Sequence, residues 1–213
     1  MSPNPATPPA AGAAAAPGVV PRAEFRVFGQ GLIAALQPRL FNGRTVLGQM
    51  RRHPPETYLV SAADEGLNVK LREGKLDVKT RIAITPEGYE IYEPRAKLPL
   101  PLSPDALAEL FALLGQPVPA STGEAVDAAA LLALLRAQPG LSVLEVEKQR
   151  HGFSIDGVIC EYALVLFNGA QMETVCVESS EPAAMTPVIA ELGLAGMANT
   201  GYVRAAQRVL GLR

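Results

Sequence analysis

Two runs decide the fold, Asn68-Val69-Lys70-Leu71-Arg72 and Asp77-Val78-Lys79-Thr80-Arg81-Ile82, because polar and apolar side chains alternate in each of them. Alternation with a period of two predicts β-strands, and Glu73-Gly74-Lys75 between the runs predicts the short turn of a hairpin. Successive side chains of a strand point to opposite faces, so one face of the hairpin collects the cations Lys70, Arg72, Lys79 and Arg81. The other face carries Val69, Leu71, Val78 and Ile82, on which helices can pack.

A third run of this kind extends from Leu144 to Arg150 and adds Lys148 and Arg150 to one face. A flat sheet with six cations on one face would repel itself, whereas a sheet curled around a multivalent anion would not. We therefore predict an α+β protein with a mostly antiparallel, barrel-like sheet, helices packed on its outside and an anion-binding interior. A plain sheet with one solvated face is the alternative, because antiparallel sheets commonly expose one polar face.

Acidic residues stand in other strand-like segments. Glu24 shares a face with Arg26, Glu161 follows a short apolar run, and Glu178 shares a face with Cys176. Carboxylates that face into a cationic barrel can hold Mg²⁺ or Mn²⁺, which are hard cations that prefer oxygen ligands and bridge phosphate groups. The alternative is that these carboxylates form internal salt bridges with the cations.

The composition is that of a globular chain of 213 residues, 48% hydrophobic and 19% charged, with a formal net charge of -2. This balance argues against a nucleic-acid partner or a membrane-binding surface, and no apolar run reaches the ~20 residues of a membrane span. Cys160 and Cys176 lack the spacing of a zinc site. They can form one disulfide or remain reduced in the core, and we favour the reduced state and a cytoplasmic location.

The chain divides into a tail and a body. Residues 1–21 consist mainly of Ala, Pro, Gly and Ser, a composition typical of a disordered tail. The first basic residue is Arg22, so this segment lacks the basic start of a secretory signal. We expect residues 22–213 to form a single domain.

Helices are expected at two places in this body. A helical pair at about 103–138 separates two strand-rich halves, with Ser103 as one N-cap and Ser121, at capping-box spacing from Glu124, as the other. Two short helices, Pro182–Leu192 with an internal proline and Thr200–Leu210, close the chain.

Short motifs follow one another along the chain in a characteristic order. They are Glu24-Phe25-Arg26-Val27-Phe28, the strand Tyr58-Leu59-Val60, the basic pairs of Val69–Arg72 and Val78–Arg81, Lys148-Gln149-Arg150, Glu161-Tyr162, Cys176-Val177-Glu178, and a closing helix over Asn199–Leu212 with Tyr202. This order resembles the CYTH superfamily of triphosphate tunnel enzymes, which includes class IV adenylyl cyclases, thiamine triphosphatases and inorganic tripolyphosphatases. The resemblance extends over residues 22–213, and the order and spacing of the motifs carry it.

The resemblance implies that the basic residues bind a triphosphate in a β-tunnel and that carboxylates hold a catalytic divalent cation, Mg²⁺ or Mn²⁺. The implied phosphate-binding residues are Arg26, Lys70, Arg72, Lys79, Arg81, Lys148 and Arg150, and the implied metal ligands are Glu24, Glu161 and Glu178. The chain departs from the family where Arg26 and Phe28 replace the second Glu and the Lys of Glu-x-Glu-x-Lys, and where Cys176 replaces the first Glu of the late Glu-x-Glu.

The function implied by this pattern is binding of a small triphosphate compound: tripolyphosphate, thiamine triphosphate or a nucleoside triphosphate. Metal-dependent hydrolysis is the candidate activity, and a non-catalytic module that binds polyphosphate or another anion is the alternative, because the metal motifs are incomplete.

One local motif points to a different class of protein. Gly29-Gln30-Gly31-Leu32-Ile33-Ala34 fits the Gly-x-Gly-x-x-Ala pattern of a dinucleotide loop, and would make the chain an NADPH-binding oxidoreductase. The strand before it argues against this, because it carries Glu24 and Arg26 where a parallel strand would be apolar on both faces. His53 and His151 are isolated and suggest no ligand pair.

Overall fold

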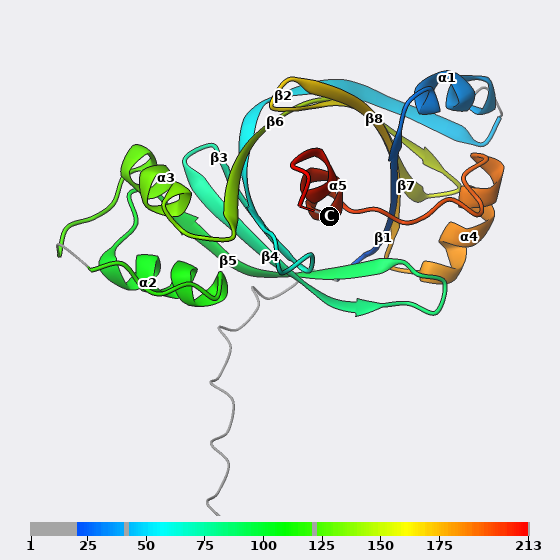
Figure 1. The fold of residues 1–213 in the computed structure, drawn as a ribbon. Coiled ribbons are helices and arrows are strands. Elements are labelled where there is room, and N and C mark those ends of the chain that lie inside the picture. Colours follow the sequence, from blue (N-terminus) through cyan, green and yellow to red (C-terminus); the bar gives the residue numbers. More distant parts are fainter. Residues whose placement is uncertain (1–20, 41–42, 121–122, 213) are drawn as a thin grey trace, which may run out of the picture.

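The computed structural model describes residues 21–40, 43–120 and 123–212, and eight strands of this part close into one barrel in the order β1-β5-β4-β3-β2-β6-β7-β8 (Figure 1). They are β1 (Ala23–Gly29), β2 (Thr45–Ser61), β3 (Leu67–Arg72), β4 (Lys75–Ile84), β5 (Glu90–Pro99), β6 (Leu141–Ile155), β7 (Val158–Phe167) and β8 (Ala170–Ser179). Every pairing between neighbouring strands is antiparallel. The predicted fold class is confirmed, and the parallel sheet of a dinucleotide-binding domain is excluded.

The β3–β4 hairpin has the predicted strands and a shorter turn than expected. Glu73 and Gly74 form its two central residues, with φ of 49° and 70°, and Lys75 already belongs to β4. Positive φ at both positions is the geometry that matches the twist of the flanking strands, and glycine adopts it at little cost.

Ile82 departs from the predicted pattern, since its side chain is 46% exposed instead of packed under helices. The pairing of β4 with β5 shifts register between Val78 and Lys79 and again between Arg81 and Ala83. Ile82 is the residue left without a partner at the second shift, so the end of β4 does not continue the apolar face of Leu76 and Val78.

The predicted helical pair packs on the outside of β2, β3 and β4 (Figure 1). In α2 (Pro104–Leu113) the Ser103 side chain accepts a hydrogen bond from the Ala106 N–H, as predicted. In α3 (Ala128–Arg136) the N-cap is Asp127, which accepts from the Ala130 N–H at 2.8 Å. The predicted cap Ser121 lies outside the described residues, as does the tail up to residue 20.

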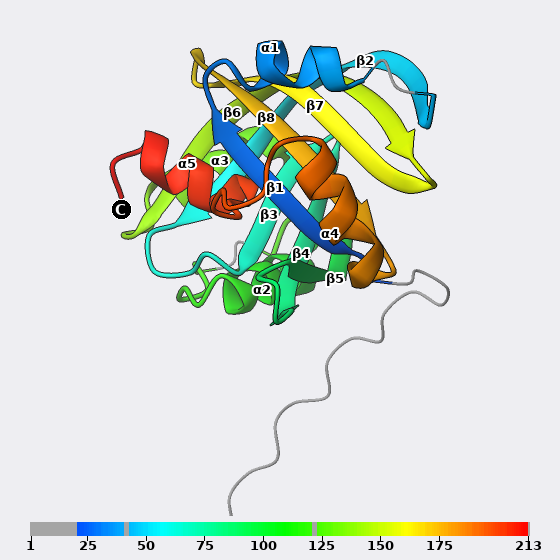
Figure 2. The same cartoon turned by 90° about the vertical axis from the view of Figure 1, so that its right-hand side faces the viewer.

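The opposite side of the barrel is covered by α1 (Leu32–Leu36), the 3-10 helix η1 (Gln37–Arg39) and α4 (Pro182–Glu191) (Figure 2). Met185, Val188 and Ile189 of α4 are buried against this wall. Pro187 lies inside α4 without ending it. No helix among the described residues has the length and apolar character needed to cross a membrane.

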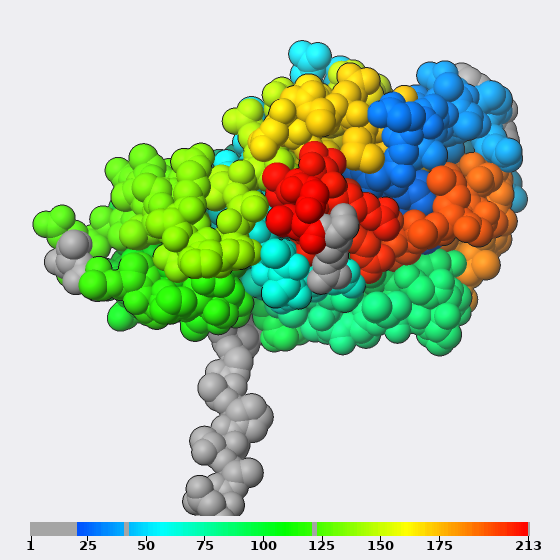
Figure 3. All heavy atoms as spheres, viewed as in Figure 1, coloured from blue at the N-terminus to red at the C-terminus, as the bar shows by residue number. Residues whose placement is uncertain are grey.

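The last helix, α5 (Tyr202–Val209), lies in one end of the barrel (Figure 1). The other helices, in contrast, pack on the outer wall of the barrel. The space-filling view shows the C-terminal residues over the middle of this end (Figure 3). Ala205 and Ala206 are buried against side chains that point into the barrel, namely Tyr58, Val60, Leu144, Val146, Ala163, Val165 and Phe167. Because this end of the interior is apolar, a short helix with a buried small-residue face closes it.

The segment before α5 also completes the wall beside β1, which pairs with β5 at only two positions. The Asn199 side chain accepts from the Arg26 N–H at 2.9 Å and donates to the Gly88 carbonyl at 2.8 Å. The Thr200 N–H donates to the Arg26 carbonyl at 2.6 Å. The C-terminal segment therefore fixes both α5 and the main chain at Arg26.

Candidate functional site

A cavity of about 210 Å³ lies inside the barrel, next to the N-terminal end of α5. Cationic side chains outnumber carboxylates by six to two in its lining. The cations are Arg26, Lys70, Arg72, Lys79, Lys148 and Arg150, and the carboxylates are Glu24 and Glu178. Alternation along β1, β3, β4 and β6 turns these cations inward, as the sequence pattern predicted.

Arg81 does not line this cavity, although it was grouped with the other cations. Its guanidinium is bonded to Glu90 at 2.7 Å and to Glu65 at 3.1 Å, and both carboxylates also bind Arg204 of α5. Lys79, Thr80 and Arg81 pair with β5 in one unbroken register, so the bonds to Glu90 and Glu65 are what hold Arg81 outside the cavity lining.

Glu56 of β2 holds three of the cations together and was missed by the sequence analysis. It is 4% exposed, and its carboxylate lies 2.5 Å from Lys148 Nζ and 3.5 Å from both Lys70 Nζ and Arg72 Nη1. Burial alone would raise the pKa of Glu56, but the attraction of Lys148, Lys70 and Arg72 lowers it to about 2. The Pro54-Pro55 pair and a register shift in front of Glu56 hide its alternation in the sequence.

Lys148 is the most deeply enclosed of the lysines in the cavity. Besides Glu56, its ammonium group donates to the Tyr58 hydroxyl at 2.9 Å and lies 4.1 Å from the centre of the Tyr202 ring. Burial, together with the nearby charge of Lys70, lowers the pKa of Lys148 to about 7 in spite of Glu56. A bound anion would favour the charged form of this lysine.

Arg26 is 3% exposed, and its guanidinium forms ion pairs with the carboxylates of Glu24 and Glu161. Its Nε donates to Glu24 at 2.9 Å, and its Nη1 donates to Glu161 at 3.3 Å and to the Thr174 hydroxyl at 3.4 Å. Glu161 is also ion-paired with Arg150. Two of the three predicted metal ligands, Glu24 and Glu161, thus form the internal salt bridges that were the alternative to a metal site.

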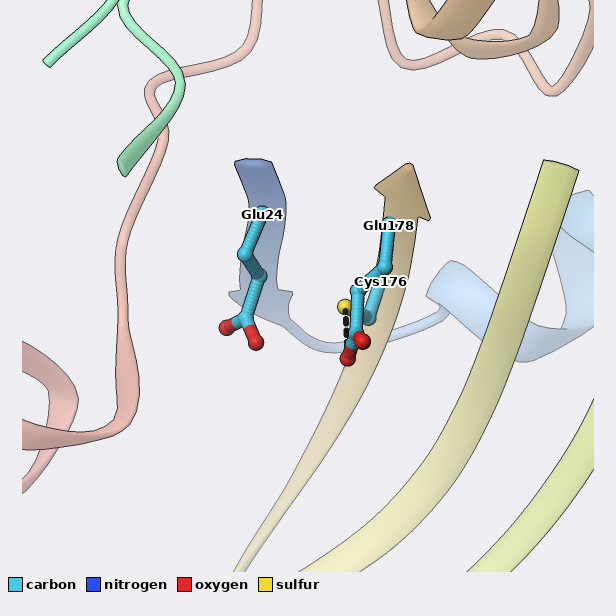
Figure 4. A group of neighbouring side chains, drawn as sticks. All are labelled: Glu24, Cys176 and Glu178. Carbon is cyan, nitrogen blue, oxygen red and sulfur yellow. Dashed lines mark hydrogen bonds between the residues drawn. The ribbon is translucent and has the colours of Figure 1, made fainter. Parts of the chain in front are cut away.

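Glu24, Cys176 and Glu178 form a group in which one ligand atom of each lies within 4.8 Å of the others (Figure 4). In distance, this group is compatible with a divalent metal. Its members are Glu24 on β1 and the other two on β8, and Glu161 is not part of it. The sequence analysis placed Cys176 on a face with Glu178 and expected it to be a reduced core cysteine, without counting it among the metal ligands.

With Arg26 in place, this group is a poor site for Mg²⁺ or Mn²⁺. Burial raises the pKa of the Cys176 thiol well above its usual value. Sulfur is a soft ligand, so Mg²⁺ and Mn²⁺, which prefer oxygen, would have only Glu24 and Glu178 in this group. Burial and the neighbouring Glu24 raise the pKa of Glu178, while the pKa of Glu24 is lowered because Arg26 overcomes the effect of burial. A positive guanidinium therefore already occupies one side of the group.

A second cavity, of about 350 Å³, shares Arg150 and Glu178 with the first. It is also lined by Arg22, Arg51 and His53, so basic side chains continue beyond the inner cavity. Burial, and next Arg150, lower the pKa of His53. His151 lines neither cavity and stacks on Tyr162, with ring centres 4.6 Å apart.

Cys160 and Cys176 are both buried and free, as favoured from the sequence. Cys160 belongs to the outer apolar cluster under α4, whereas Cys176 lies among the charged groups listed above. Burial raises the pKa of Cys160 to about 12.

The barrel is closed and antiparallel, and the cations of four of its strands point inward. The chain therefore has the closed, barrel-like antiparallel sheet with an inward-facing set of cations that the sequence predicted. No protein-family model matches the chain, and no curated protein matches it.

Solved structures that are similar to this chain include three from different organisms. The PH1012 protein of Pyrococcus horikoshii is 16% identical, with 86% of this chain and 96% of that chain covered at a TM-score of 0.43. A protein proposed as an adenylate cyclase, from Bacillus halodurans, is 12% identical with 88% and 98% covered at a TM-score of 0.44. HpAC1 from Hippeastrum, a proposed adenylyl cyclase with a dominant triphosphatase activity, is 15% identical with 89% and 96% covered at a TM-score of 0.44. At these values no activity and no residue role is carried over to this chain.

Proposed function

We propose that the barrel binds a small triphosphate compound in its inner cavity. The observation that carries this proposal is the convergence of six cations from four strands, with two carboxylates in the same lining, on a half-open cavity of about 210 Å³. Phosphate oxygens are strong acceptors for ammonium and guanidinium donors, and these bonds strengthen where water is excluded.

The side chains would divide this work between them. Lys79 has no ion-pair partner in the described part of the chain, and so it is available to a phosphate group without breaking an internal contact. Lys70, Lys148, Arg72 and Arg150 would exchange part of their contact with Glu56, Asp77 and Glu161 for contact with the ligand. Arg81 is left out of the proposed set, because Glu90 and Glu65 hold it elsewhere.

Hydrolysis of the bound triphosphate is a second candidate, and the grouping of Glu24, Cys176 and Glu178 favours it. With Mg²⁺ or Mn²⁺ on the two carboxylates, the metal would supply charge stabilisation at the transferred phosphoryl group. The unsuitable thiol and the bonded Arg26 argue against such a cation, so binding is the leading proposal. The identity of the triphosphate and the cytoplasmic location stay predictions of the sequence.

Isothermal titration calorimetry with tripolyphosphate tests the proposal. We expect micromolar binding to the unaltered protein and a loss of at least tenfold in Lys70→Ala/Lys79→Ala. The matched control is Arg136→Ala, which removes an exposed cation of α3 outside the barrel and should leave the affinity unchanged. Absence of binding, or equal binding by the double variant, contradicts the proposal. Release of inorganic phosphate with Mn²⁺ and none with EDTA would add hydrolysis to the function.

A further inference from the structure

We infer that Arg26 serves as the built-in cation of the barrel, so that triphosphate binding requires no divalent metal. The inference rests on the proposed function, and it assigns to one side chain the charge that a metal would supply.

The position of Arg26 is the first argument. Its guanidinium bridges Glu24 at 2.9 Å and Glu161 at 3.3 Å, and in the β1–β8 register Arg26 lies directly opposite Cys176. Glu24, Cys176 and Glu178 form the only group among the described residues whose ligand atoms lie close enough together to hold a metal ion. Arg26 therefore contacts one member of this group, Glu24, and faces another, Cys176. A divalent cation there would have to displace Arg26 from Glu24 or lie beside a positive charge.

The second argument is that Arg26 is firmly held. It is 3% exposed, its Nη1 also donates to Thr174, and its main-chain N–H and carbonyl are both bonded to the segment before α5. The guanidinium also lies 4.6 Å from the centre of the Tyr202 ring. A charge fixed by carboxylates, a hydroxyl and an aromatic face is in position before the ligand arrives, as a bound metal would be.

The third argument is spare bonding capacity. Arg26 lines the inner cavity, and its Nε and Nη1 donate to protein oxygens, whereas no described residue accepts from its Nη2. A planar guanidinium cannot lose its proton and presents donors at fixed angles, which suits a phosphate oxygen. Nη2 can thus bind the ligand while the other nitrogens keep Glu24 and Glu161 neutralised.

Calorimetric titration of the unaltered, full-length protein with tripolyphosphate, in EDTA and in saturating Mn²⁺, tests this inference directly. We expect binding in EDTA that is at least as tight as binding with Mn²⁺, because the metal would compete with Arg26 and the lysines for the same phosphate oxygens. Binding that is detected only with Mn²⁺ overturns the inference and leaves the proposed function standing. Absence of binding in both arms overturns the proposed function itself, and the inference with it.

Electron paramagnetic resonance of free Mn²⁺, without any phosphate ligand, supplies a readout that is independent of activity. The unaltered protein and the surface control Arg136→Gln should leave Mn²⁺ free, whereas Arg26→Gln should take up Mn²⁺ at Glu24 and Glu178. Mn²⁺ uptake by the unaltered protein that equals the uptake by Arg26→Gln contradicts the inference, and so does the absence of uptake by a folded Arg26→Gln protein. If Arg26→Gln does not fold, Arg26→Lys is the second variant, because it keeps the positive charge. Its affinity for tripolyphosphate in EDTA should stay within about tenfold of that of the unaltered protein. A requirement for Mn²⁺ in this variant would also contradict the inference.

Discussion

Individual charges in the barrel differ mainly in how completely the protein already neutralises them. Lys79 has no ion-pair partner among the described residues, Lys148 is bonded to Glu56, and Arg26 is bonded to two carboxylates. Burying a charge costs free energy unless a partner compensates, so these side chains should respond differently to a bound anion.

Lys148 should make anion binding depend on pH. Its pKa of about 7 means that the ammonium form dominates below pH 7 and is lost above it, while Glu56, Tyr58, Tyr202, Lys70 and Arg26 surround it. If the bound anion requires the charged form, the apparent affinity should fall by roughly tenfold or more between about pH 6.5 and about pH 9. Calorimetry across this range measures the effect. In Lys148→Arg the charge persists, so a pH step of equal size in that variant would show that another group is responsible.

Glu56→Gln should weaken the fold and strengthen anion binding. The pKa of Glu56 is depressed to about 2, so its stabilising contribution is complete above its ordinary value of 4.5 and is lost as the pH falls through about 2. At neutral pH the loss should be roughly 2–3 kcal/mol in urea unfolding, and it should shrink towards low pH. The variant leaves Lys148, Lys70 and Arg72 without their shared carboxylate, so the affinity for tripolyphosphate should rise several-fold at a pH that keeps Lys148 charged. Because Glu56 raises the pKa of Lys148, this range lies at lower pH in the variant.

The exposed residue Glu109 of α2 provides the matched control for this experiment, since Glu109→Gln removes a carboxylate that is remote from the cavity. It should change stability by less than about 0.5 kcal/mol. A Glu56→Gln protein that is as stable as this control would show that the buried ion pairs contribute nothing net.

At the scale of elements, the helix caps show how local signals and structure can differ. Asp127 caps α3, and Glu124 lies exposed before it. Asp127→Ala should therefore cost about 1 kcal/mol in urea unfolding, whereas Glu124→Ala should be nearly neutral. A larger loss of stability in Glu124→Ala than in Asp127→Ala would contradict this and support the capping box that the sequence spacing predicted.

At the scale of the whole molecule, a ligand that binds the closed barrel and not the unfolded chain should stabilise the fold. At a tripolyphosphate concentration of about 100 times the dissociation constant, the gain is about 2.7 kcal/mol, which for a chain of this length corresponds to a rise in Tm of roughly 5–10 °C. Differential scanning calorimetry in EDTA measures it. An equal rise in Lys70→Ala/Lys79→Ala would place the ligand outside the inner cavity.

The sequence by itself determined the features that depend on neighbouring residues. Alternation in the β3–β4 hairpin and in β6 identified the strands and the side chains that share a face, and Ser103 identified the start of α2. The inward set of cations follows from this period of two alone, because a strand turns every second side chain to the same side. The resemblance to the CYTH superfamily added the order in which these elements follow one another.

Only the tertiary structure decided which charges meet. Arg26 reaches Glu161 across 135 positions of the chain, and Glu56 reaches Lys148 across 92. Arg81 leaves the predicted set because Glu65 and Glu90 hold it outside the cavity lining. The short amphipathic pattern of α5 predicts a helix, but it does not predict that this helix lies in the end of the barrel. The physical reason is that local periodicity sets the face of a side chain, whereas its partner is set by strand register, bulges and closure of the barrel, which depend on contacts between distant segments.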